Sequence, residues 1–178
     1  MAINLSSLAV ELMVFFREME ERKKINSNVI RQLNLFLREL YAKERLWVSR
    51  LDVPIKTAFV LYLAARNSMM ILEKLIQKIE KANQFRQNPQ VIREAMQIFP
   101  LIFDIYTGLE KAEATVPDVG FSLQKRIFDS VKTLRNAAGK FGLLPTFNEE
   151  TRGIDREIVK EEFARWDKRV WMKAAYEL

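Results

Sequence analysis

The sequence predicts an all-α protein, an elongated helical bundle of about six helices around a long central buried helix. Hydrophobic residues recur three and four positions apart through most of the chain, which is the spacing of one helix face. The 178 residues include only 5 Gly and 5 Pro, which is typical of helices joined by short connections. The segment 57–65, TAFVLYLAA, is apolar on every side, and a helix of that kind is buried all round.

The central helix is predicted to begin at Pro54 and to end near Arg86. Pro54 suits a first helical turn, because its φ is fixed near the helical value and its missing N–H leaves no hydrogen bond unmade. The residue before Pro89 is pushed out of the helical region, which closes the helix. Such a helix is roughly 45–50 Å long. Lys56 and Arg66 bracket an apolar run that is too short to cross a bilayer, so we expect no membrane span.

A first helix is predicted over residues 7–24. Its core-facing residues recur at helical spacing: Leu8, Leu12, Phe15, Phe16 and Met19. Val10 and Val14 widen this apolar stripe, which predicts that the first helix packs against two neighbours.

A second helix is predicted over residues 29–50, with Ser27 or Asn28 as its N-cap. Its expected core face consists of Ile30, Leu33, Phe36, Leu37, Leu40, Tyr41, Trp47 and Val48. Residues 51–53 connect it to the central helix, either as a tight antiparallel hairpin, which we favour, or as a kinked continuation.

Two further helices complete a predicted bundle core over residues 1–145. A helix over residues 90–114 is expected to be interrupted by a kink near Phe99, because Pro100 removes a hydrogen bond from its interior. A turn over residues 117–120 follows, and Ser122 is expected to cap a fifth helix. The core face of that helix is Leu123, Ile127, Val131, Leu134 and Ala138.

The last part of the chain is predicted to be separate from the core. Residues 146–153 form a polar linker, and residues 154–178 form a charged amphipathic C-terminal helix. Its apolar seam is Val159, Phe163, Trp166, Val170 and Ala174. This helix packs either on its own bundle or on a partner.

The composition argues against most catalytic chemistry. The chain has no Cys and no His, so it lacks a cysteine nucleophile, the commonest general base and the commonest metal ligand. It also lacks a glycine-rich phosphate loop. We therefore expect no enzymatic activity, no cofactor and no metal, with a carboxylate-held magnesium site as the remaining catalytic alternative. No signal peptide is evident, since Glu11 interrupts the first apolar stretch, and we expect a cytoplasmic protein.

Two charged residues lie in apolar surroundings, Arg66 at the end of the central run and Asp104 within PLIFDIYTGL. Either one could contact a ligand. A buried charge is tolerated when it is paired, so we expect these two residues to pair with each other or to reach the edge of the bundle.

The net charge of +6 is unevenly distributed. Residues 53–88 hold six Lys or Arg and two Asp or Glu, and residues 121–145 hold five and one, so each segment carries +4. On the fifth helix, three lysines fall opposite the core stripe, with Arg126 and Arg135 on its flanks. If the central and fifth helices lie together, they form a basic patch. Its predicted residues are Lys74, Lys78, Lys81, Arg86, Lys125, Arg126, Lys132, Arg135 and Lys140.

These patterns give two hypotheses. The first is a non-enzymatic helical subunit of an oligomer or larger complex that binds a nucleic-acid phosphate backbone, without reading its sequence, through the basic patch. An ordinary soluble basic surface is the alternative interpretation of that patch. The second is a protein–protein adaptor or structural subunit that docks through the C-terminal helix without nucleic acid. Its predicted partner-binding residues are Phe163, Trp166, Val170 and Trp171.

Overall fold

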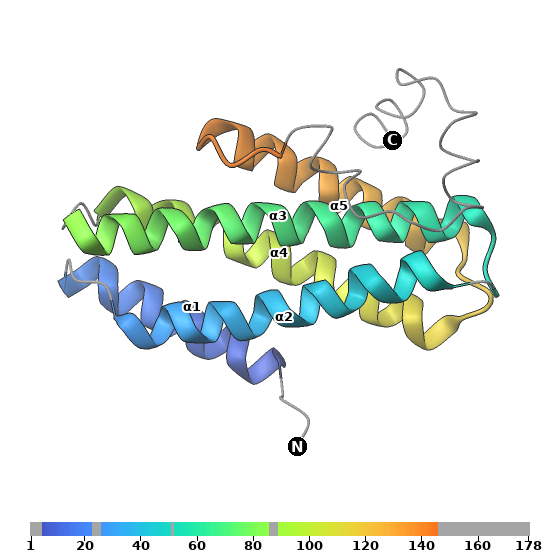
Figure 1. Cartoon of the computed structure of the whole chain (residues 1–178), viewed down its shortest axis with the longest axis horizontal. Helices are drawn as coiled ribbons and strands as arrows, with labels where there is room; N and C mark the ends of the chain where they lie inside the picture. The colour runs from blue at the N-terminus through green and yellow to red at the C-terminus, as the bar shows by residue number, and fades with distance from the viewer. Residues whose placement is uncertain (1–4, 23–25, 51, 86–88, 146–178) are drawn as a thin grey trace.

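The computed structural model describes residues 5–22, 26–50, 52–85 and 89–145. These ranges hold five helices, α1 (Leu5–Arg22), α2 (Ser27–Ser49), α3 (Ile55–Phe85), α4 (Pro89–Thr115) and α5 (Phe121–Lys140), and no strand. Figure 1 shows an elongated bundle, which confirms the predicted all-α class. The expected count of six is one more than the described residues contain, because the predicted linker and sixth helix lie outside them.

The centre of the bundle is α3, as predicted. Every residue from Thr57 to Ala65 is buried, because α2, α4 and α5 all pack against this helix. Further along α3 the buried set narrows to one side, with Leu72, Leu75 and Ile79 inside and Glu80 and Lys81 exposed. The wholly apolar run therefore lies where α3 has neighbours all round.

The connection between α2 and α3 is the antiparallel hairpin (Figure 1). The predicted N-cap of α2 is wrong, because Asn26 takes that position and its side chain accepts a hydrogen bond from the backbone N–H of Asn28 at 3.0 Å. Ser27 and Asn28 lie inside the first turn. Tyr41 was expected in the core but is partly exposed, and its hydroxyl lies 3.4 Å from a carboxylate oxygen of Glu73 on α3.

The helix α1 packs on α4 and α2 through one face, on which Leu12 and Phe16 are fully buried. The two predicted neighbours are present, but Val10 and Val14 are not buried against either of them. Val10 is 66% exposed and Val14 is 47% exposed, because no helix of the described ranges covers that flank of α1. Both valines instead border a shallow apolar groove between α1 and the middle of α4.

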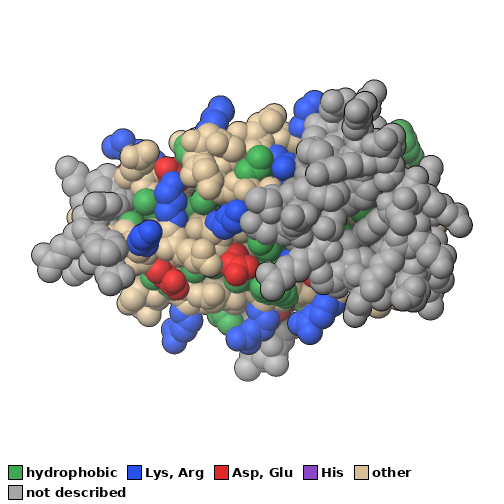
Figure 2. Space-filling model, turned by 45° about the horizontal axis from the view of Figure 1, so that its top comes forward, with side chains coloured by type: hydrophobic (Ala, Val, Ile, Leu, Met, Phe, Trp, Pro, Cys, Tyr) green, Lys and Arg blue, Asp and Glu red, His purple; other side chains and the backbone are tan. Residues whose placement is uncertain are grey.

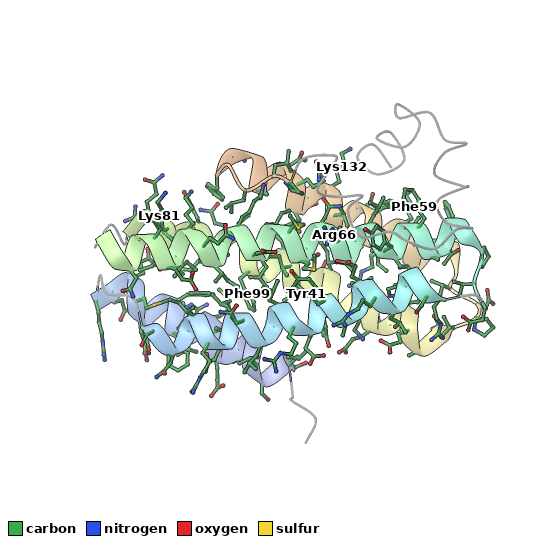
Figure 3. The ribbon with its side chains drawn as sticks, in the orientation of Figure 1. Tyr41, Phe59, Arg66, Lys81, Phe99 and Lys132 are labelled. Carbon is green, nitrogen blue, oxygen red and sulfur yellow. The ribbon has the colours of Figure 1, made fainter. Side chains whose placement is uncertain are left out.

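The helix α4 continues through Pro100 as a single helix, and Pro100 itself is exposed, while the kink near Phe99 stays a prediction. The side chain before it anchors the core. The ring of Phe99 packs in T-shaped contacts against Phe16 on α1, at 5.9 Å between centroids, and against Phe36 on α2, at 5.3 Å. Figure 3 places Phe99 between the helices. The ring of Phe99 thus anchors α4 to α1 and α2 directly beside its proline.

The helix α5 begins at Phe121, with Gly120 in the N-cap position, so the expected cap at Ser122 is wrong. The predicted core face is correct: Ile127, Val131, Leu134 and Ala138 are buried, and Leu123 is half-buried. Through this face α5 packs in the angle between α3 and α4.

Candidate nucleic-acid interface

The basic-patch hypothesis requires α3 and α5 to lie together, and they do. The guanidinium of Arg135 donates a hydrogen bond to the side-chain oxygen of Asn67. About two and three helical turns further along α3, the ammonium groups of Lys74 and Lys78 donate to the backbone carbonyls of Leu144 at 3.2 Å and Phe141 at 3.0 Å. The two helices therefore run side by side in the same direction (Figure 1).

Some of the cations predicted to bind phosphate already have partners within the protein. Lys78 also forms an ion pair of 2.6 Å with Glu94, a nearly buried carboxylate on α4. Arg126 lies 3.7 Å from the carboxylate of Asp104 on α4. Together with Lys74 and Arg135, these residues fasten α5 and the segment after it to its neighbours. Four of the predicted binding residues thus have structural partners.

Four other lysines of the predicted patch are exposed and have no hydrogen bond or ion pair with the described residues: Lys81, Lys125, Lys132 and Lys140. We call these four residues the basic face. On α5, spacings of seven and eight residues keep three of them on the side opposite the buried stripe. Figure 3 shows Lys81 and Lys132 on the same side of the bundle. The remaining predicted residue, Arg86, lies outside the described residues.

The surface around the basic face carries both signs of charge. Figure 2 turns the α5 side towards the viewer and shows Lys and Arg side chains spread over it, with fewer Asp and Glu among them. On α5 itself there are five Lys or Arg and a single acidic residue, Asp129. The excess of positive charge on α5 therefore reaches the solvent mainly through lysines that no described carboxylate neutralises.

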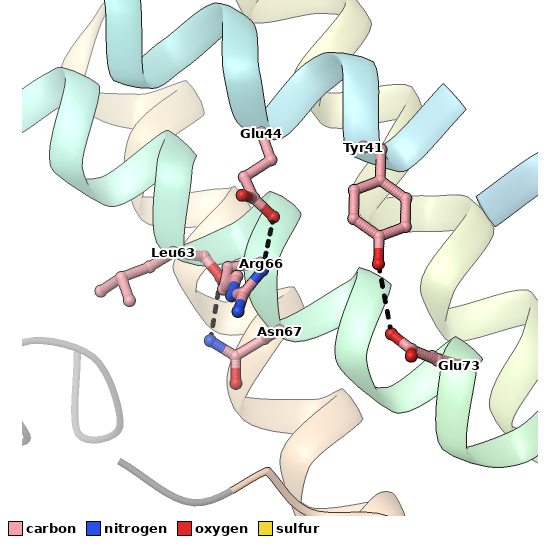
Figure 4. A network of polar contacts seen from close by, with 6 residues as sticks. All are labelled: Tyr41, Glu44, Leu63, Arg66, Asn67 and Glu73. Carbon is pink, nitrogen blue, oxygen red and sulfur yellow. Dashed lines mark hydrogen bonds and ion pairs between the residues drawn. The ribbon is translucent and has the colours of Figure 1, made fainter. Parts of the chain in front are cut away.

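The expected pairing of Arg66 with Asp104 is wrong. Arg66 reaches α2 instead, where its guanidinium donates to the carboxylate of Glu44 at 3.1 Å (Figure 4), and both side chains are close to 90% buried. Burial raises the pKa of Glu44 above its usual value, while Arg66 partly offsets that rise. Asp104 is exposed at the edge of the bundle, which is the second of the two outcomes expected for it. Its carboxylate accepts a hydrogen bond from the Ser130 hydroxyl at 2.8 Å.

Sequence reasoning overlooked Glu94, which ties Lys78 to α4. A signal was present, because Glu94 falls between Val91, Ile92, Ala95 and Ile98 on the apolar face of its helix. A carboxylate in such a position needs a cation from a neighbouring helix. Finding which cation required the packing of α3 against α4.

The described ranges contain no cluster of three or more acidic side chains that could hold a metal ion. None of their helices combines the length and the apolar character that a bilayer crossing requires. The predicted partner-binding residues Phe163, Trp166, Val170 and Trp171 lie outside the described residues.

Comparisons with models of protein families, with curated proteins and with solved structures gave no match to this chain. Its function is therefore inferred from its own side chains and their geometry.

Proposed function

We propose that this protein is a non-enzymatic helical subunit that binds the phosphate backbone of a nucleic acid, without reading its sequence, within an oligomer or larger complex. One observation carries the proposal: the four lysines of the basic face are exposed and have no partner among the described residues, whereas neighbouring cations are bound to carboxylates or carbonyls. An unpaired ammonium group can approach a phosphate without first giving up a partner.

The spacing of these lysines suits an extended polyanion. At 1.5 Å of rise per residue, Lys125, Lys132 and Lys140 follow one another along α5 at intervals of roughly 10–12 Å. Lys81 adds a cation from the far part of α3. Lysines that neutralise phosphates release bound counterions, which favours association and needs no contact with base edges.

The experiment that tests the proposal is fluorescence anisotropy with labelled RNA, single-stranded DNA and duplex DNA at low salt. We expect the wild type to bind, and we expect the triple variant Lys125→Glu/Lys132→Glu/Lys140→Glu to lose at least 10-fold in affinity, because each substitution replaces an attraction to phosphate with a repulsion.

A matched control is available on α2, which lies on the other side of α3 from α5 (Figure 1). Arg31, Arg38 and Arg45 are exposed there, and their reversal to Glu changes the net charge by the same amount. We expect the α2 variant to lose much less affinity than the α5 variant. Equal losses would mean that net charge alone drives binding, and the basic face would then have no special role.

A further inference from the structure

A hollow of about 590 Å³ lies beside the basic face, between the first half of α5 and the middle of α4. This volume is within the range of small-molecule sites, about 300–1,000 Å³. Its lining residues are Leu101, Asp104, Phe121, Ser122, Lys125, Arg126, Asp129, Ser130 and Thr133. Phe121 stands out among them, because it is 78% exposed, more than any other large hydrophobic side chain in the described ranges.

The charges around the hollow make it unsuitable for a phosphate. The lining holds two cationic side chains, Lys125 and Arg126, and two anionic ones, Asp104 and Asp129, so its formal charge is zero, although only Arg126 pairs with a carboxylate among the described residues. The carboxylate of Asp104 is held in place by the Ser130 hydroxyl at 2.8 Å and by the guanidinium of Arg126 at 3.7 Å. A phosphate entering here would meet two carboxylates. An uncharged, flat group would instead meet an aromatic ring together with hydrogen-bond donors and acceptors.

We propose that the hollow receives an unstacked nucleobase, which lies against the ring of Phe121, and that the ligand is therefore a single-stranded nucleic acid. This inference rests on the proposed binding of phosphates by the basic face. Phe121 precedes Lys125 by one helical turn, about 6 Å along α5. A base on the ring would thus place its own backbone beside Lys125 and Lys132.

The preference for a single strand follows from the chemistry of stacking. In a duplex each base is already stacked and paired, and taking it out costs free energy. In a single strand the base face is accessible, and stacking on an aromatic side chain is favourable for every kind of base. A combination of exposed aromatic ring and lysine track is the arrangement that single-strand binding proteins use.

The test compares one short labelled RNA as a single strand and as a duplex with its complement, using the full chain. We expect tighter binding of the single strand. We expect Phe121→Ala to weaken single-strand binding about 5- to 100-fold while changing duplex binding less than 2-fold. Phe121→Trp should retain single-strand affinity, because it keeps an aromatic face. Leu144→Ala, which shortens another exposed apolar side chain, serves as the control and should have no effect.

Because Phe121 is exposed, its removal should leave the thermal unfolding of the protein unchanged, and the same samples check this. If Phe121→Ala binds the single strand as the wild type does while the lysine reversals still weaken binding at least 10-fold, the stacking site is refuted and the basic face stands. If the wild type binds neither the single strand nor the duplex, the proposed function itself fails and this inference fails with it.

Discussion

At the scale of single residues, the best-defined polar feature is the buried pair of Glu44 and Arg66. The sequence shows that Arg66 ends an apolar run and so must be paired. It does not show which carboxylate pairs with it, because that depends on how α2 and α3 are aligned. Asp104 was the wrong candidate, since it lies at the boundary between α4 and α5 and reaches solvent.

Breaking this pair should be costly. Arg66→Met leaves the Glu44 carboxylate buried without its cation, and we expect a loss of about 3–5 kcal/mol in the free energy of unfolding. The double variant Glu44→Leu/Arg66→Met removes both charges and should recover most of that loss. Urea unfolding of the wild type, both single variants and the double variant measures these differences. Additive losses in the double variant would show that the two groups do not stabilise each other.

The same pair predicts a pH dependence. Burial, the larger cause, raises the pKa of Glu44 above its usual 4.5, and Arg66 lowers it in part. The folded state therefore binds this proton more tightly than the unfolded state. This contribution to stability is full below about pH 4.5 and is lost as the pH rises through the raised pKa.

A comparison of the wild type with Glu44→Gln checks this dependence, because glutamine does not titrate. The free energy of unfolding of the wild type, relative to that of the variant, should fall as the pH increases from about 4 to 7. A relative stability that rises over this range would mean that the pKa of Glu44 is lowered in the folded state, contrary to the expectation.

At the scale of helices, apolar spacing predicted where each helix lies and which side faces inward. The prediction held best for α3 and α5, whose apolar stripes match their buried sides. The two neighbours predicted for α1 are present, but Val10 and Val14 stay exposed, because spacing reports which residues share a side but not how wide a strip of that side the neighbours cover. The caps were missed for a local reason. Asn26, Ser27 and Asn28 can all cap a helix, and only the backbone geometry selects one of them.

The close packing of α4 against α5 gives a prediction for two glycines. A Cβ atom at Gly108 would lie 2.9 Å from Cγ1 of Ile127, whereas a Cβ at Gly139 would meet nothing within 4 Å. We therefore expect Gly108→Ala to lower the free energy of unfolding by about 1–2 kcal/mol. Gly139→Ala should raise it by up to about 1 kcal/mol, through helix propensity. Thermal unfolding of both variants measures these changes. If Gly108→Ala raises the stability instead, α5 moves away from α4 without a cost in free energy.

At the scale of the whole molecule, the charge count along the sequence pointed to α3 and α5, and the structure places them side by side. The outward positions of Lys125, Lys132 and Lys140 were predictable from the apolar stripe of α5. The hydrogen bonds of Lys74 and Lys78 to backbone carbonyls were not predictable, because they depend on where the chain after α5 meets α3. The division of the patch into structural cations and the four lysines of the basic face therefore emerges only from the packed bundle.

The most direct test of the basic face is the salt dependence of binding to a labelled single-stranded RNA. If its four lysines each contact one phosphate, the logarithm of the association constant should fall with the logarithm of salt concentration with a slope of about −2 to −3, since each contact on a single strand contributes roughly −0.7. Reversal of the three lysines on α5 should bring the slope close to zero. A wild type that shows no binding at low salt, or binding with no dependence on salt, would contradict the assignment of the basic face to phosphate contacts.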